Sequence, residues 1–202
     1  MSYIDSWKNK KVFEDQLKLN ELELEKYPAH WNLFIEAISC ITPAPTTLLD
    51  IGCGAGVYHE LCNRHFPDIE YTGMDYSQGA IDVAKQRWGG ERWEVKDYQD
   101  LSVEDTLNYD VLHAGAMLDV LPNGDEAFSF LLSLGFKNLI IGRAKLIHEN
   151  SKSIEYRVYN RIDTYAYSHN VSALLRVCET FDYHPTLTGD SNSCTLLLRK
   201  NP

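Results

Sequence analysis

Three glycines alternate with small residues directly after a short apolar stretch. They are Gly52, Gly54 and Gly56, and Asp50 lies two residues before the first of them. Glycine lets the backbone turn sharply and approach a ligand closely, and a helix that begins just afterwards points its unpaired N–H groups at that ligand. The pattern therefore predicts a loop that cradles a nucleotide-type cofactor. Its G-x-G-x-G spacing differs from the G-x-G-x-x-G spacing of dinucleotide-binding loops.

Two further acidic residues stand where the next strands of a parallel sheet are expected to end. Residues 69–75 read as a strand that ends in Asp75, and residues 93–97 read as a strand that ends in Asp97. A carboxylate at such a strand end accepts hydrogen bonds from the ribose hydroxyls of a nucleoside cofactor. Because the carboxyl ends of parallel strands share one edge of the sheet, Asp50, Asp75 and Asp97 predict a binding site along that edge.

With this loop and these acids, residues 45 to 200 resemble the class I S-adenosylmethionine-dependent methyltransferases. The resemblance implies a three-layer, doubly wound α/β sheet of about seven strands, mostly parallel, with an antiparallel strand in a C-terminal hairpin. It also implies S-adenosyl-L-methionine as the cofactor, with Asp75 at the ribose and Asp97 beside the adenine ring. The cofactor-binding residues that it carries over are Asp50, Gly52, Cys53, Gly54, Gly56, Asp75, Tyr76, Asp97, Tyr98 and Ala114.

The rest of the chain alternates strand-like and helix-like patterns, as a parallel sheet covered by helices requires. Helices are predicted at 57–65, 77–88, 125–134 and 171–181. Further strands are predicted at 109–115, 138–147, 183–188 and 194–199. Residues 148–169 read as a polar stretch, which we expect on the acceptor side of the site.

Residues 1–44 lie outside the shared core and are expected to form a helical cover or lid, whereas residues 45–202 form the cofactor-binding domain. Apolar residues from Phe13 to Tyr27 recur on one side of a first amphipathic helix, and a second helix spans about residues 30–40. Helices in this position are expected to fold over the open end of the cofactor site and to exclude water from it.

Composition restricts the classes of substrate and partner. The chain has 202 residues, 44% of them hydrophobic, and a net charge of −10, which suits one acidic domain and argues against a nucleic-acid substrate. It shows no apolar run that would span a bilayer and no signal peptide, so we expect a cytoplasmic protein without membrane contact. The five cysteines never follow a C-x-x-C spacing, which favours free thiols and no metal site. The sequence gives no indication of the oligomeric state.

The residues after the fourth predicted strand lack the motifs that family members use for chemistry. The Asn/Asp-Pro-Pro-Tyr sequence of many amino-methylating members is absent, and Val120 stands where small-molecule members often carry a histidine. Methyl transfer from a sulfonium needs mainly alignment and desolvation, so a base is required only for a protonated acceptor. The catalytic residue therefore stays open, with His148, Tyr165 and His169 as candidates. His113 fits a hydrogen-bonded core histidine better than a site residue.

The resemblance favours methyl transfer to a small molecule, such as a sugar or a biosynthetic intermediate. The first alternative is an NAD-dependent oxidoreductase, which shares the use of Asp75 but prefers the other glycine spacing and offers no role for Asp97. The second is a relative of the fold that binds the cofactor or a partner without catalysis.

Overall fold

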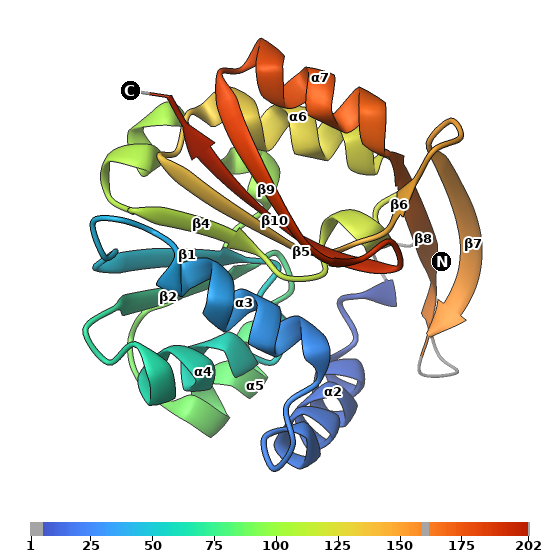
Figure 1. Ribbon diagram of the computed structural model, residues 1–202. Helices are drawn as coiled ribbons and strands as arrows, with labels where there is room; N and C mark the ends of the chain where they lie inside the picture. Colours follow the sequence, from blue (N-terminus) through green and yellow to red (C-terminus); the bar gives the residue numbers. More distant parts are fainter. Residues whose placement is uncertain (1–5, 159–161, 202) are drawn as a thin grey trace.

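The protein consists of a central seven-stranded sheet between two layers of helices (Figure 1). The computed structural model describes residues 6–158 and 162–201. The helices are α2 (Lys10–Glu23), α3 (Ala29–Ser39), α4 (Val57–His65), α5 (Gln78–Trp88), α6 (Gly124–Leu134) and α7 (Val171–Thr180). Helices α6 and α7 cover one face of the sheet, and α3, α4 and α5 cover the other (Figure 1). The α/β fold class expected from the sequence is confirmed.

The sheet has the strand order β3-β2-β1-β4-β5-β10-β9. Its strands are β1 (Thr47–Ile51), β2 (Glu70–Asp75), β3 (Trp93–Val95), β4 (Val111–Ala114), β5 (Asn138–Ala144), β9 (Tyr183–Asp190) and β10 (Ser193–Lys200). The first five pair in parallel, and β10 pairs antiparallel with both β5 and β9. The parallel part and the antiparallel C-terminal hairpin both agree with the prediction.

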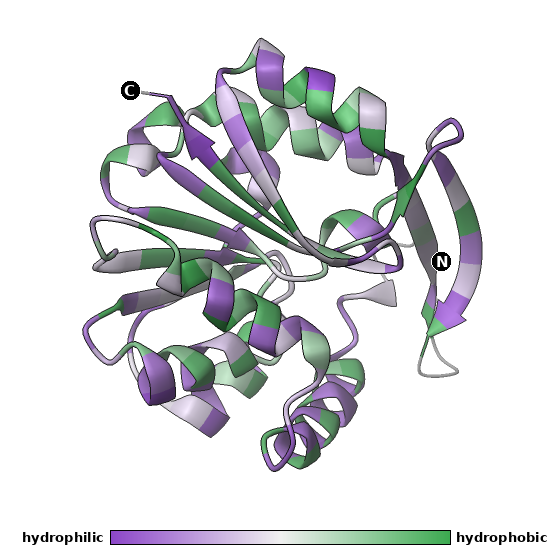
Figure 2. Cartoon of the chain, viewed as in Figure 1, coloured by the Kyte–Doolittle hydropathy of each residue, from purple (hydrophilic) through white to green (hydrophobic). Residues whose placement is uncertain are grey.

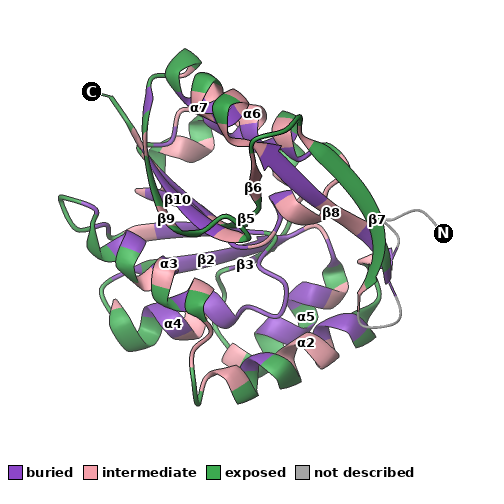
Figure 3. Cartoon of the chain, turned by 45° about the vertical axis from the view of Figure 1, so that its right-hand side comes forward, coloured by how far each residue is buried: buried purple, intermediate pink, exposed green. Residues whose placement is uncertain are grey.

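Apolar residues of the sheet alternate between two cores. Successive side chains of a strand point to opposite faces, so Leu48 packs with Trp31 and Phe34 of α3, whereas Leu49 packs with Phe128 of α6. The central strands are accordingly hydrophobic and buried over most of their length (Figures 2 and 3). A sheet buried on both faces leaves a bound ligand only its edges, and the carboxyl ends of the parallel strands meet at one of them.

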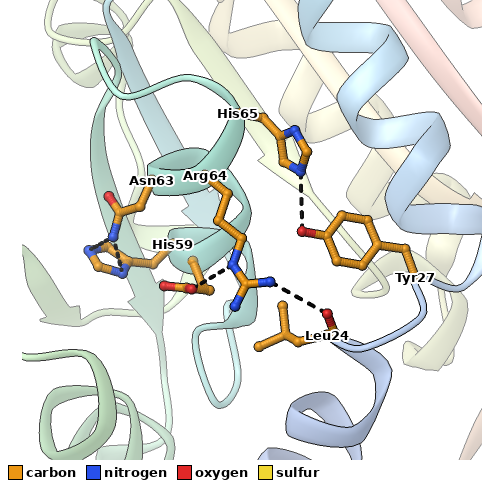
Figure 4. Close-up of polar contacts among 7 residues, drawn as sticks. Leu24, Tyr27, His59, Asn63, Arg64 and His65 are labelled. Carbon is orange, nitrogen blue, oxygen red and sulfur yellow. Dashed lines mark hydrogen bonds and ion pairs between the residues drawn. The ribbon is translucent and has the colours of Figure 1, made fainter.

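The two N-terminal helices are tied to the body of the molecule at several points. Helix α2 packs along α5, where Arg87 forms an ion pair with Glu21 at 2.6 Å. Figure 4 shows the connection between α2 and α3 against α4, where the Arg64 Nη1 donates to the Leu24 carbonyl at 3.4 Å. The ring of Tyr27 meets His65 through a contact of 3.2 Å between the Tyr27 hydroxyl and the His65 Nε2. These contacts fix where α2 lies relative to the glycine loop.

Most of the polar stretch at residues 148–169, to which the sequence pattern assigned no strand, forms strands. Strands β7 (Lys152–Val158) and β8 (Ile162–Asn170) make an antiparallel hairpin, and β6 (Leu146–Ile147) joins β8 in a small three-stranded sheet. Strand β7 is exposed along nearly all its length (Figure 3). Because β7 has no buried face, its sequence shows no apolar face, and the pattern did not indicate a strand there.

Shorter elements connect the strands near the carboxyl edge. They are the 3-10 helices η1 (Tyr98–Asp100), η2 (Val103–Leu107) and η3 (Leu118–Val120). The third strand therefore ends at Val95, before Asp97, which caps η1 with its side chain. The predicted fifth strand is interrupted after Ala144.

Candidate cofactor and acceptor site

A cavity of about 380 Å³ lies at the carboxyl edge of the parallel strands. Among the residues carried over for cofactor binding, it is lined by Gly52, Gly54, Asp75, Tyr76, Asp97 and Tyr98. A smaller cavity of about 70 Å³ shares Gly52 with it and is also lined by Asp50 and Cys53. Residues predicted at separate strand ends therefore line two adjoining cavities.

The N–H groups of the glycine loop already donate to protein acceptors. The Cys53 N–H donates to the Met74 carbonyl at 3.0 Å, the Gly54 N–H to Asp75 at 3.0 Å and the Ala55 N–H to Gln16 at 2.9 Å. The Gly56 N–H donates to the Cys53 carbonyl at 3.0 Å. A loop that binds a pyrophosphate needs free N–H groups for it. These four amides are engaged, so the loop suits a cofactor without phosphate.

Gly54 lies where the loop comes closest to α2. Its φ is +55°, and a Cβ built on it would stand 2.5 Å from the Gln16 Oε1. Because left-handed backbone and close approach coincide, glycine is the residue that fits. The side chain of Gln16 thus covers the loop from the N-terminal segment.

Asp75 is a buried carboxylate that faces the cavity and holds the glycine loop. Its two oxygens accept the N–H groups of Gly54 and Ser77, at 3.0 and 2.9 Å. Burial raises the pKa of Asp75 to about 6, although the two backbone donors lower it. Each carboxylate oxygen has a second lone pair, so the group can still accept hydrogen bonds from a ribose.

Asp50 lines the smaller cavity and is held by two core side chains, so its role toward a cofactor stays a prediction. It is buried, accepts a hydrogen bond of 2.5 Å from the Tyr71 hydroxyl, and lies 2.7 Å from the His113 Nδ1. Asp50 is not among the residues that line the cavity of about 380 Å³. Asp50 therefore acts first on the core below the loop. His113 packs between Phe34 and Tyr58, as expected for a core histidine.

Gly56 and Ala114 also lie away from the large cavity. A Cβ on Gly56 would stand 2.5 Å from the Trp93 ring, so this glycine makes room for a core tryptophan. Ala114 is fully buried at the end of β4. Neither residue lines the large cavity, and their role in cofactor binding stays a prediction.

The three candidates for catalysis are not among the described residues that line either cavity. His148 is exposed, and its carbonyl accepts from Asn170. Tyr165 is half-buried on β8. His169 is fully buried, with its Nδ1 2.7 Å from Asp125. A catalytic role for these residues stays a prediction that their position does not support.

Polar residues of the cavity wall that were not anticipated include Gln16, Asp119 and Arg143. Asp119 follows β4, and its Oδ1 is buried without a hydrogen-bond partner in the described structure. Burial raises the pKa of Asp119 to about 6, although the nearby Arg143 lowers it. An acid shortly after the fourth strand was a signal available in the sequence. Gln16 had none, because only packing brings α2 to the loop.

The N-terminal segment closes the cavity on the side of the hairpin. The Trp7 Nε1 donates to the Thr164 hydroxyl at 3.1 Å, and that hydroxyl donates to the Val120 carbonyl at 3.3 Å. Trp7 and Phe13 line the cavity together with Tyr156 and Val158 of β7. These contacts link the N-terminal segment to β8 and to the residues that follow β4, beside the cavity.

We expect the affinity for S-adenosylhomocysteine to fall as the pH drops from 7 to 5. The ionised form of Asp75 is the better acceptor for ribose hydroxyls, and its pKa of about 6 means that the proton binds within this range. The loss should be about tenfold or less for one titrating group. Calorimetry at several pH values measures it.

Asp75→Asn should abolish this pH dependence, and Asp119→Asn should keep it. A dependence retained in Asp75→Asn would contradict the assignment.

The free energy of unfolding should change with pH in the opposite sense from the affinity, so the fold gains stability as the pH drops. Since the pKa of Asp75 is raised in the folded state, its contribution to stability is greatest below the unfolded pKa of about 3.9 and is lost as the pH rises through about 6.

Known proteins share both the sequence pattern and the fold of this chain. Residues 49–134 match the family model of a methyltransferase domain. This match includes the glycine loop, Asp75 and Asp97. The chain thus carries a methyltransferase domain over residues 49–134. The family assigned from the sequence is thus confirmed, and S-adenosylmethionine is the cofactor of that family.

A curated relative is trans-aconitate 2-methyltransferase from Methylobacterium nodulans, which is 35% identical over 80 residues. The matched stretch covers 40% of this chain and 30% of the relative. The same enzyme from Yersinia pseudotuberculosis is 32% identical over 45% of this chain and 34% of its own length. The chain spans about a third of the length of these curated relatives.

Solved structures extend the likeness of fold over nearly the whole chain. The plantazolicin methyltransferase BpumL, in complex with S-adenosylhomocysteine, aligns with a TM-score of 0.64 and 15% identity over 99% of this chain and 94% of its own. The TehB-like methyltransferase from Corynebacterium glutamicum aligns with a TM-score of 0.62 and 17% identity over 96% of this chain and 100% of its own. At these identities the likeness establishes the fold.

The residues of the cavity fit the cofactor of the family. Its lining offers a carboxylate for ribose at Asp75 and two further carboxylates, Asp97 and Asp119, that attract a sulfonium cation. In the described parts of the chain, no group of three His, Cys, Asp or Glu side chains is arranged to hold a metal ion. Nor is any helix there long and apolar enough to cross a bilayer.

Proposed function

We propose that this chain transfers the methyl group of S-adenosylmethionine to a small acceptor that binds in the cavity of about 380 Å³. The observation that carries the proposal is the state of the glycine loop. It lines the cavity beside Asp75, but the four N–H groups from Cys53 to Gly56 already donate to protein oxygens. Such a loop fits a phosphate-free nucleoside cofactor better than a dinucleotide.

In this proposal Asp75 binds the ribose, Asp97 and Tyr98 flank the base, and Gly52 and Gly54 allow close approach of the amino-acid end. When bound, S-adenosylmethionine supplies a methyl group on a positively charged sulfur. The carboxylates of Asp75, Asp97 and Asp119 favour binding of that cation. Trp7, Phe13 and Tyr156 exclude water from the space in which the acceptor lies.

Asp119 is the residue that we propose to receive a proton when the acceptor is a hydroxyl or an ammonium group. It lines the cavity, its Oδ1 lacks a hydrogen-bond partner within the described residues, and its pKa is raised to about 6. A base with a pKa near the operating pH combines ionisation with a useful affinity for protons. It replaces His148, Tyr165 and His169 as the first residue to test.

Calorimetry and a methylation assay test the proposal in two steps. S-adenosylhomocysteine should bind, and NAD should not bind at millimolar concentration. Labelled S-adenosylmethionine is then incubated with a panel of sugars, amines, phenols and carboxylic acids, among which trans-aconitate represents the curated relatives. Labelled product from any small acceptor supports the proposal.

The outcomes separate the alternatives. Preferential binding of NAD would favour an oxidoreductase. Binding of S-adenosylhomocysteine without methylation of any acceptor would favour a non-catalytic relative of the fold. Asp119→Asn should retain cofactor affinity within a few-fold while turnover of hydroxyl acceptors falls by about 100-fold, the lower end of what a general base contributes. Equal turnover in the wild type and in Asp119→Asn would show that Asp119 is not the base.

A further inference from the structure

Arg143 occupies an irregular position at the carboxyl end of β5. Ile141 pairs with Leu196 and Ala144 pairs with Cys194, so two residues of β5, Gly142 and Arg143, face one residue of β10. This is a β-bulge, a feature that redirects a side chain and is common beside active sites. Arg143 has a φ of +61°, a left-handed conformation that is strained for a non-glycine residue.

The bulge brings the Arg143 side chain to both cavities. Arg143 lines the cavity of about 380 Å³ and the cavity of about 70 Å³, as do Gln16, Gly52 and Ala116. Arg143 therefore lies where the large cavity meets the smaller cavity beside the glycine loop. Strained backbone conformations cluster at binding and active sites. An arginine held in one at this junction therefore indicates a residue that binds a ligand.

No described side chain forms a hydrogen bond or an ion pair with this guanidinium. Of the cationic side chains that line the large cavity in residues 6–158 and 162–201, Lys96 is paired with Asp105 at 3.3 Å. Arg143 makes no hydrogen bond or ion pair with any side chain in these same residues. Burial is the main cause of the pKa shifts of Asp119, Glu23 and His30, and the charge of Arg143 acts to lower the pKa of each, so these groups lie near Arg143 without pairing with it. A cation within reach of a cavity and without a protein partner is available to an anionic ligand.

We propose that Arg143 binds a carboxylate group of a ligand in this cavity, and that the methyl acceptor is therefore a carboxylic acid. The planar guanidinium matches a carboxylate with two parallel hydrogen bonds, a geometry that lysine does not offer. The proposal rests on the proposed methyl transfer, since it names the class of acceptor for that reaction.

Two carboxylates meet this chemistry: that of the acceptor and that of the amino-acid end of the cofactor. Strand β5 lies two strands away from β1 in the sheet order, with β4 between them, and β2 and β3 lie on the other side of β1. Arg143 is thus on the opposite side of the glycine loop from Asp75 and Asp97. We expect the acceptor to be the source.

The first arm of the test measures acceptors in the wild type, Arg143→Gln and Arg143→Lys. The probes are carboxylic acids of three to six carbons and their primary amides, titrated by calorimetry without cofactor and then assayed for methylation. Arg143→Gln should weaken binding of the acid, and raise its KM, by about tenfold, because one charge-assisted contact is lost. The amide should be unaffected, and Arg143→Lys should fall between. Arg176→Gln, on the exposed face of α7, is the charge-matched control.

The second arm compares S-adenosylhomocysteine with 5′-methylthioadenosine, which lacks the amino-acid carboxylate. A tenfold loss for S-adenosylhomocysteine alone in Arg143→Gln would keep the carboxylate site but assign it to the cofactor, and would overturn the acid acceptor. Equal binding of acids and of S-adenosylhomocysteine to the wild type and Arg143→Gln would overturn the site itself. A wild type that binds S-adenosylhomocysteine but methylates nothing would contradict the proposed function alone, because direct titration of the acids still tests Arg143.

Discussion

Asp75→Ala is expected to weaken the binding of S-adenosylhomocysteine by one to two orders of magnitude. In the proposed function this carboxylate accepts hydrogen bonds from the ribose, and charge-assisted bonds of this kind contribute about 1.5 to 3 kcal/mol each. The structure adds a second effect. Since Asp75 also accepts from the Gly54 and Ser77 N–H groups, its removal leaves two buried donors without a partner and loosens the loop. Calorimetry gives the affinity, and urea unfolding gives the stability.

The control separates the ribose contact from the loop. Asp97→Ala removes a cavity carboxylate that is less buried and that caps η1 through the Gln99 N–H. It should lower affinity by less than Asp75→Ala and change stability little. If Asp75→Ala binds S-adenosylhomocysteine as the wild type does, the ribose lies elsewhere and the cofactor site must be reassigned.

Gly56→Ala is expected to destabilise the fold by about 3 kcal/mol. The φ of Gly56 is +79°, which costs an L-residue about 1 to 2 kcal/mol, and the new Cβ would lie 2.5 Å from the Trp93 ring, which adds an overpacking cost of about 1 to 3 kcal/mol. For a chain of this size the midpoint of thermal unfolding should fall by about 10 °C. Thermal unfolding followed by circular dichroism measures the change without relying on tryptophan fluorescence.

Gly135→Ala is the matched control for this effect. Gly135 has nearly the same backbone, with φ 86° and ψ 26° against φ 79° and ψ 23° at Gly56. A Cβ there would meet only Lys200 atoms at 3.9 Å, so Gly135→Ala isolates the backbone cost. Trp93→Leu should also relieve the steric part in the double mutant. Equal destabilisation by Gly56→Ala and Gly135→Ala would contradict the packing role of Trp93.

The sequence by itself determined the parallel core and the order of its elements. The alternation of apolar strands and amphipathic helices is local, and it placed α4 at Val57–His65 and α7 within a residue of its observed end. The positions of Asp75 and Asp97 followed because residues at the carboxyl ends of adjacent parallel strands lie at one edge. These features depend on periodicity and strand direction, which a single sequence carries.

The β7–β8 hairpin illustrates what local pattern does not carry. Its strands pair with each other and project from the main sheet, so burial does not impose an apolar face on β7 (Figure 3). Only the pairing of Lys152–Val158 with Ile162–Ser168 defines them as strands. The segment that the sequence placed at the acceptor does contribute to the cavity, through Tyr156 and Val158 rather than through Tyr165 or His169.

Tertiary packing alone decided which polar groups are free to meet a ligand. Asp50 and Asp75 look equivalent in the sequence, but Tyr71 and His113 engage Asp50 in the core while Asp75 faces the cavity. Gln16 reaches the loop because α2 packs on α5, and Arg143 reaches the cavity because its strand bulges against β10. Hydrogen-bond partners and bulges arise between segments far apart in the chain, so no local pattern records them.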